Sequence, residues 1–119
     1  DSSFRMPGLQ FGVVLGVRRL ATLIGSDAAR DILQTSRVFV VVHARSCGFL
    51  TNVCGSDGCR ALVTQAAADA AVLTDDSRRA LLQQSRDDRH LDQDMAALVR
   101  SASHPGLAQR IAAYLASLK

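Results

Sequence analysis

Three cysteines lie within thirteen residues of one another, and their spacing makes them the first candidates for chemistry. Residues 45–59, which contain all three, are rich in Gly, Ser, Asn and Asp, and this composition predicts a loop. Only four residues separate Cys54 from Cys59, and two of them are glycines that let the chain turn back. We therefore expect a disulfide bond between Cys54 and Cys59, with Cys47 left free or bridging to another chain.

A metal site is the alternative use of the same cysteines. His43, Cys47, Cys54 and Cys59 formally make a Cys3His set of zinc ligands. Neither pair has the two-residue spacing that is typical of a zinc knuckle, so the disulfide is favoured. Three reduced, structural thiols are the remaining alternative. Cys47 as a nucleophile would need a base oriented by an acid, and no such acid can be identified. The sequence thus predicts no metal, no cofactor and no catalytic residue, in a protein that is not an enzyme.

An apolar segment followed by two arginines is the best candidate for contact with a partner. Leu9–Val17 is the longest nearly apolar run, and it is far too short to cross a bilayer. Gly12 and Gly16 would let another surface approach closely, while Arg18 and Arg19 would attract an anionic membrane or a phosphate-bearing molecule. We expect these four residues to contact another protein or an anionic membrane surface. The stretch lacks the glycine patterns of phosphate-binding loops.

The spacing of apolar residues predicts a mainly helical chain. Residues 18–35 carry a helical stripe that is interrupted at Gly25, which predicts two short helices with a bend. From Arg60 onward the pattern is helical throughout, in three or four helices. Thr74 is expected to cap one of them, Asp87 to open the next, and Pro105 to begin the last.

Two strands are expected before residue 45. Residues 10–17 favour a strand over a helix only slightly, on the strength of their valines. Val38–His43 is apolar on both faces, which predicts a central strand covered on both sides. A helix between two directly paired strands would make them parallel. We expect an α+β fold, predominantly helical, that starts β-α-β and continues with three or four helices; an α/β sandwich is the alternative.

Length and composition limit the classes of protein to consider. The chain has 119 residues, of which 48% are hydrophobic and 21% charged, with a net charge of +3. These values exclude a disordered tail and predict a single domain over residues 1–119. Aromatic residues make up only 4%, so a base-stacking surface and nucleic-acid binding are not expected. All 11 acidic residues are Asp, and 13 of the 14 basic residues are Arg.

Two hypotheses for function follow from these features. An odd number of cysteines, a near absence of Lys and a first residue other than Met favour a small, processed, secreted protein of the toxin or effector type. It would act on another cell or surface without catalysis, through the apolar glycine-bearing segment. The alternative is an intracellular, cytoplasmic, mostly helical interaction or regulatory module that forms homo-oligomers. Disulfide formation favours the first hypothesis, because disulfides seldom persist in the cytosol.

Overall fold

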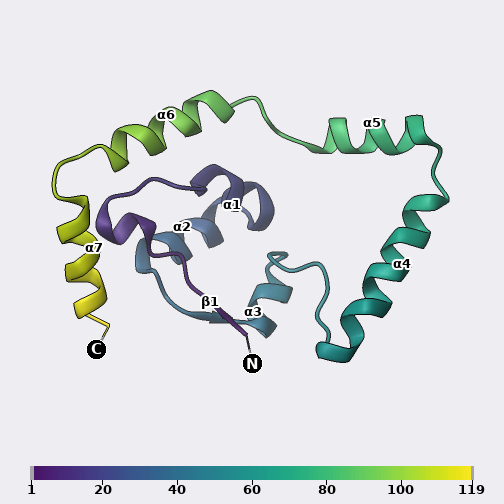
Figure 1. Ribbon diagram of the computed structural model, residues 1–119, viewed down its shortest axis with the longest axis horizontal. Helices are drawn as coiled ribbons and strands as arrows, with labels where there is room; N and C mark the ends of the chain where they lie inside the picture. The colour runs from purple at the N-terminus through teal and green to yellow at the C-terminus, as the bar shows by residue number, and fades with distance from the viewer. Residues whose placement is uncertain (1, 119) are drawn as a thin grey trace. The chain divides into compact units, whose positions relative to one another are not determined.

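The computed structural model describes residues 2–118, which form a mainly helical structure with one small sheet (Figure 1). This confirms the predicted α+β class. In chain order the elements are β1 (Ser3–Phe4), the 3-10 helix η1 (Gly8–Phe11), α1 (Val17–Ile24), α2 (Ser26–Thr35), β2 (Phe39–Val40), α3 (Val41–Ser46), the 3-10 helix η2 (Ser56–Gly58), α4 (Cys59–Ala71), α5 (Asp75–Ser85), α6 (Leu91–Ala102) and α7 (Leu107–Ala116).

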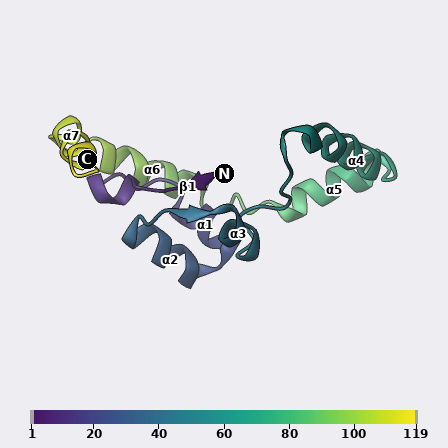
Figure 2. The same ribbon diagram turned by 90° about the horizontal axis from the view of Figure 1, so that it is seen from below.

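The chain divides into two compact units, which Figure 2 shows from a second direction. Unit 1 is the chain up to Thr51 together with the chain from Leu91 onward, and unit 2 is Asn52–His90. The sheet, η1, α1 to α3, α6 and α7 belong to unit 1, while η2, α4 and α5 belong to unit 2. The single domain expected over residues 1–119 stays a prediction.

The core of unit 1 lies between α1, α2 and the short sheet. The buried apolar residues of the described chain are Leu20, Ala29, Ile32, Leu33, Phe39 and Ala44. Two aromatic rings extend this core, because Phe4 and Phe49 pack against Phe39 with centroids 5.5 and 5.4 Å away. Burial of Phe39 therefore connects β1, β2 and the chain after α3 to the two helices.

The sheet differs from the expected parallel one. β1 pairs with β2 in antiparallel fashion, with Ser3 opposite Val40 and Phe4 opposite Phe39. The prediction of a central strand over Val38–His43 is wrong, because only Phe39–Val40 is extended and α3 begins at Val41. Only one face of β2 packs on the core: Phe39 is 2% exposed, whereas Val40 is 55% exposed. A strand of two residues needs no cover on its second face.

The strand expected over residues 10–17 is also absent. The segment instead contains the end of η1, a loop and the start of α1. Gly12 and Gly16 have φ values of +84° and +68°, in the left-handed region that favours glycine. These two turns break both the alternation of a strand and the periodicity of a helix. The glycines therefore shape this loop.

The helices predicted from the spacing of apolar residues are present in the structure. α1 and α2 are separated at Gly25, as expected, whereas α7 begins at Leu107, two residues after Pro105, which was expected to begin it. The Thr74 hydroxyl caps α5 by accepting a hydrogen bond from the Ser77 amide at 3.2 Å. α6 begins at Leu91, four residues after the expected start. In unit 2, neither α4 nor α5 contains a buried residue.

We expect Phe39→Ala to destabilise unit 1 strongly. Removal of a fully buried ring costs about 3–5 kcal/mol of unfolding free energy, because the lost contacts leave a cavity. Val42→Ala is the matched control, since Val42 is 79% exposed and its loss should change stability by less than about 0.5 kcal/mol. Urea unfolding of both variants measures the difference. Equal midpoints would contradict the assignment of Phe39 to the core.

Candidate functional site

An apolar pocket of about 500 Å³ lies in unit 1. It is lined mainly by the segment from Arg5 to Leu23, together with Leu33 and Phe49. Its apolar lining includes Met6, Phe11, Val13, Leu15, Leu23 and Phe49, and its only charged lining residues among those described are Arg5 and Arg19. Volume and lining are those of a small-molecule site with a few polar groups. The arginines favour an anionic ligand with an apolar part.

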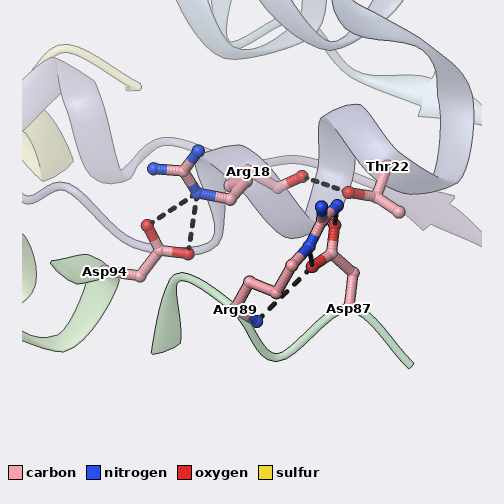
Figure 3. A network of polar contacts seen from close by, with 5 residues as sticks. All are labelled: Arg18, Thr22, Asp87, Arg89 and Asp94. Atoms are coloured by element: carbon pink, nitrogen blue, oxygen red, sulfur yellow. Dashed lines mark hydrogen bonds and ion pairs between the residues drawn. The ribbon is translucent and has the colours of Figure 1, made fainter. Parts of the chain in front are cut away.

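Polar bonds from α6 hold the loop that forms one side of this pocket. The Val14 amide donates to the hydroxyl of Ser101 at 2.9 Å, and that hydroxyl donates to the Leu98 carbonyl at 2.9 Å. In the first turn of α1, Arg18 forms an ion pair with Asp94 of α6 (Figure 3), with Nε 3.0 Å from a carboxylate oxygen. Ser101 is only 8% exposed, so its bond to Val14 is shielded from water. α6 thus fixes the loop between η1 and α1.

The four residues predicted to contact a partner have separate roles in the structure. Gly12 lies beneath the guanidinium of Arg110, and Gly16 precedes α1 with open space around it. Arg18 is paired with Asp94, whereas Arg19 lines the pocket and has no ion-pair partner among the described residues. Gly16 also lines the pocket. Contact of this segment with a protein or a membrane stays a prediction.

The expected disulfide bond is absent from the described chain, in which all three cysteines are free. Cys54 and Cys59 do lie together, with their sulfurs 3.2 Å apart, as the spacing of the two residues predicted. That distance is a hydrogen bond between thiols and is longer than a covalent S–S bond. The hydrogen bond to Cys59 raises the pKa of the Cys54 thiol, since it favours the protonated form.

The alternative zinc set is not assembled either. Among residues 2–118, no group of three or more metal-binding side chains is gathered at one place. His43 lies on α3, and its Nε2 is 3.2 Å from a terminal nitrogen of Arg37. Because a guanidinium only donates, that imidazole nitrogen accepts, and its lone pair is engaged. The thiol of Cys47 points to the Ala44 carbonyl, at 3.5 Å.

Charge is distributed unequally between the two units. Unit 1 carries nine basic and five acidic residues, a net of +4, and unit 2 carries five basic and six acidic residues, a net of −1. In unit 2, Arg78, Arg79 and Arg86 form ion pairs with nearby aspartates. Arg89 binds both carboxylate oxygens of Asp87 (Figure 3) and lowers its pKa to about 2. The positive charge therefore lies in the unit that contains the pocket.

The sequence predicted part of the pocket, since the apolar segment Leu9–Val17 and Arg19 contribute to its lining, but it did not predict the residues that join this segment from elsewhere in the chain. Ser101 meets Val14 across 87 positions of the chain, and Arg110 meets Phe11 across 99. No local pattern marks such pairs. No sequence pattern near Arg5 marked it as a site residue, since only the fold brings it to the same cavity as Arg19.

In the described chain, no helix has the length and apolar character needed to span a bilayer.

No family model and no curated protein matches this chain. Solved structures do resemble it. A crystal structure from Bordetella parapertussis, provisionally named an enoyl-CoA hydratase/isomerase, has 44% identity and a TM-score of 0.90 over 98% of this chain and 48% of its own. An enoyl-CoA hydratase/isomerase from Pseudoalteromonas atlantica T6c has 20% identity and a TM-score of 0.74 over 98% of this chain and 50% of its own. A provisionally named enoyl-CoA hydratase from Streptomyces avermitilis has 20% identity and a TM-score of 0.69, over 90% and 41%.

These likenesses correct the functional predictions. The chain spans half or less of the length of each of these proteins, and nearly all of it has their fold. The two structures at 20% identity show the fold alone, whereas the structure from Bordetella parapertussis is also related in sequence. The prediction of a secreted, disulfide-bonded toxin without enzymatic function is therefore wrong. So is the prediction that the protein is not an enzyme, because its structural relatives are named for an enzymatic reaction.

We expect Ser101→Ala to lower the unfolding free energy by about 1–2 kcal/mol, because the Val14 amide loses its acceptor in a shielded place. Ser103→Ala is the matched control, since Ser103 directly follows α6 and its exposed hydroxyl only donates to the Val99 carbonyl of that helix. Denaturant unfolding measures both. A larger loss in Ser103→Ala would refute the role given to Ser101.

We expect Cys59→Ala to speed the alkylation of Cys54. The substitution removes the hydrogen bond that raises the Cys54 pKa, so more of the reactive thiolate is present at a given pH near 8. Mass spectrometry of iodoacetamide-treated protein follows the rate, with Cys47→Ala as the control. An unchanged rate would mean that the two thiols do not interact in solution.

Proposed function

We propose that this chain belongs to an enzyme that acts on an enoyl-CoA or a related acyl thioester, and that its pocket binds the acyl group. The main support is the 44% identity and TM-score of 0.90 to the protein from Bordetella parapertussis that is provisionally named an enoyl-CoA hydratase/isomerase. The alignment covers 98% of this chain, so the pocket lies within the related part.

The pocket supports this proposal independently of the comparison. An enoyl thioester has an apolar acyl chain, and coenzyme A adds several phosphate charges. The acyl chain would be covered by the apolar lining, including Leu15 and Leu23, and each buried methylene would contribute about 0.8 kcal/mol. Arg5 and Arg19 are the charged groups of the same cavity, and guanidinium groups are well suited to bind phosphate.

The described lining points to binding rather than to proton transfer. A hydratase adds the hydroxyl of water to one carbon of the double bond and a proton to the other. An isomerase removes a proton from one carbon and returns a proton to another. Both reactions use groups that exchange protons, and among the described residues that line the pocket there is no carboxylate, imidazole or thiol. We therefore assign this surface to the acyl group.

A cytoplasmic location is part of the same proposal. The three free thiols are compatible with a reducing compartment, in which disulfides seldom persist. Enoyl-CoA is also an intracellular class of metabolite, because its charged phosphates prevent free passage through a bilayer.

We expect octanoyl-CoA, a saturated thioester, to bind to the purified chain more tightly than coenzyme A or octanoate alone. Leu15→Asp should weaken this binding about tenfold or more, because it places a carboxylate against the acyl chain and near the phosphates. Isothermal titration calorimetry measures each affinity.

Val42→Asp is the matched control, because the side chain of Val42 is highly exposed, as is that of Leu15, but does not line the pocket. Its affinity for octanoyl-CoA should equal that of the unmodified protein. Absence of binding to the unmodified protein, or an equal loss in both variants, would contradict the proposal.

A further inference from the structure

The geometry points to α7 as the element that sets the affinity of the pocket, through two positioning residues, Tyr114 and Arg110. Neither lines the pocket; they contact Arg5 and Phe11, which do. Tyr114 and Arg110 are four residues apart on one helix, so they share a face. This inference rests on the proposed function, because it treats the pocket as the site of an anionic acyl ligand.

Tyr114 holds both pocket residues with its ring. The guanidinium carbon of Arg5 lies 5.5 Å from the ring centroid, and the ring of Phe11 packs at 5.6 Å with a tilt of 60°. On its other side Arg5 is fixed by Nε, which donates to the Ser36 carbonyl at 2.7 Å. No other described residue accepts from the terminal nitrogens of Arg5, so they are left to bind an anion. A pre-positioned cation binds its ligand with a smaller loss of side-chain entropy.

The hydroxyl of Tyr114 is not what carries this role. Its oxygen is buried, and within the described chain no side chain or backbone group is hydrogen-bonded to it. A buried hydroxyl without a partner costs stability. The contribution of Tyr114 to the pocket therefore comes from the ring face that it presents to Arg5 and Phe11.

Arg110 holds the backbone of the same turn. Its Nε donates to the Phe11 carbonyl at 2.8 Å, and one terminal nitrogen donates to the Pro105 carbonyl at 2.6 Å. The guanidinium also covers Gly12, where an added Cβ would lie 3.4 Å from Nε. One planar group thus connects the end of η1 with the turn before α7. Lysine has the charge but lacks the fork that reaches both carbonyls.

The test compares Tyr114→Leu with Tyr114→Phe, using octanoyl-CoA and the neutral apolar dye Nile red as probes. Tyr114→Leu removes the ring face beneath Arg5, and we expect it to weaken octanoyl-CoA binding about fivefold. Nile red affinity should change much less, because this dye has no anion for Arg5 to bind. Tyr114→Phe retains the ring and should restore most of the affinity. Leu115→Ala, at an exposed position of α7, is the control.

The side chain of Arg5 gives a second readout that needs no ligand. Its Nε–H proton is hydrogen-bonded to Ser36 and lies near the Tyr114 ring. Its NMR signal should therefore shift in Tyr114→Leu and remain close to its original position in Tyr114→Phe. An Arg5 signal that does not move in Tyr114→Leu would overturn the inference, even in a protein that fails to bind octanoyl-CoA.

The binding results separate the two proposals. Failure of the unmodified protein to bind octanoyl-CoA would refute the proposed function, while the Arg5 signal still decides the role of Tyr114. Equal affinity of Tyr114→Leu and the unmodified protein would overturn the inference alone. An equal loss of affinity for both probes would also overturn the inference, because it indicates a general structural defect. A Tyr114→Phe variant that binds octanoyl-CoA as weakly as Tyr114→Leu would overturn it too, because the effect would then belong to the hydroxyl.

Discussion

The contact of α1 and α2 with Phe39 is the constraint on which unit 1 depends. The buried apolar residues of the described chain are few, and they come from these two helices, β2 and α3. A core of this size leaves little surplus free energy, so each of its members matters. Phe39 is the largest of them, and through Phe4 and Phe49 it also fixes the first strand and the chain after α3. The pocket forms where this core meets the segment before α1.

α6 and α7 are attached to this core in a different way. Their one buried residue is the polar Ser101, and their bonds to the rest of unit 1 include those of Ser101, Asp94 and Arg110. Directional hydrogen bonds define a position more narrowly than apolar contact does, although each contributes only about 1 kcal/mol. The chain thus uses apolar burial to form the core of unit 1, and polar bonds together with the ring of Tyr114 to place one side of its pocket.

The sequence predicted those parts of the fold that depend on neighbouring residues. The bend at Gly25, the cap at Thr74 and the last amphipathic helix all follow from residues within one or two turns. The strand at Ser3–Phe4 could not be predicted, because two residues carry no periodicity. The valines near Phe39 favoured a longer strand, yet tertiary packing used only one of them in the sheet. Arg5 and Tyr114 became visible as site residues only after folding brought them together.

The absence of buried residues from α4 and α5 has a consequence for the order in which the molecule opens. Helices that bury little apolar surface are held mainly by their own backbone hydrogen bonds, and isolated helices of their length are marginal in water. Their amides should exchange with solvent through local opening, well before those of α2. Unit 2 is then the region where a protease would cut first, while the pocket-bearing unit keeps its amides protected until global unfolding.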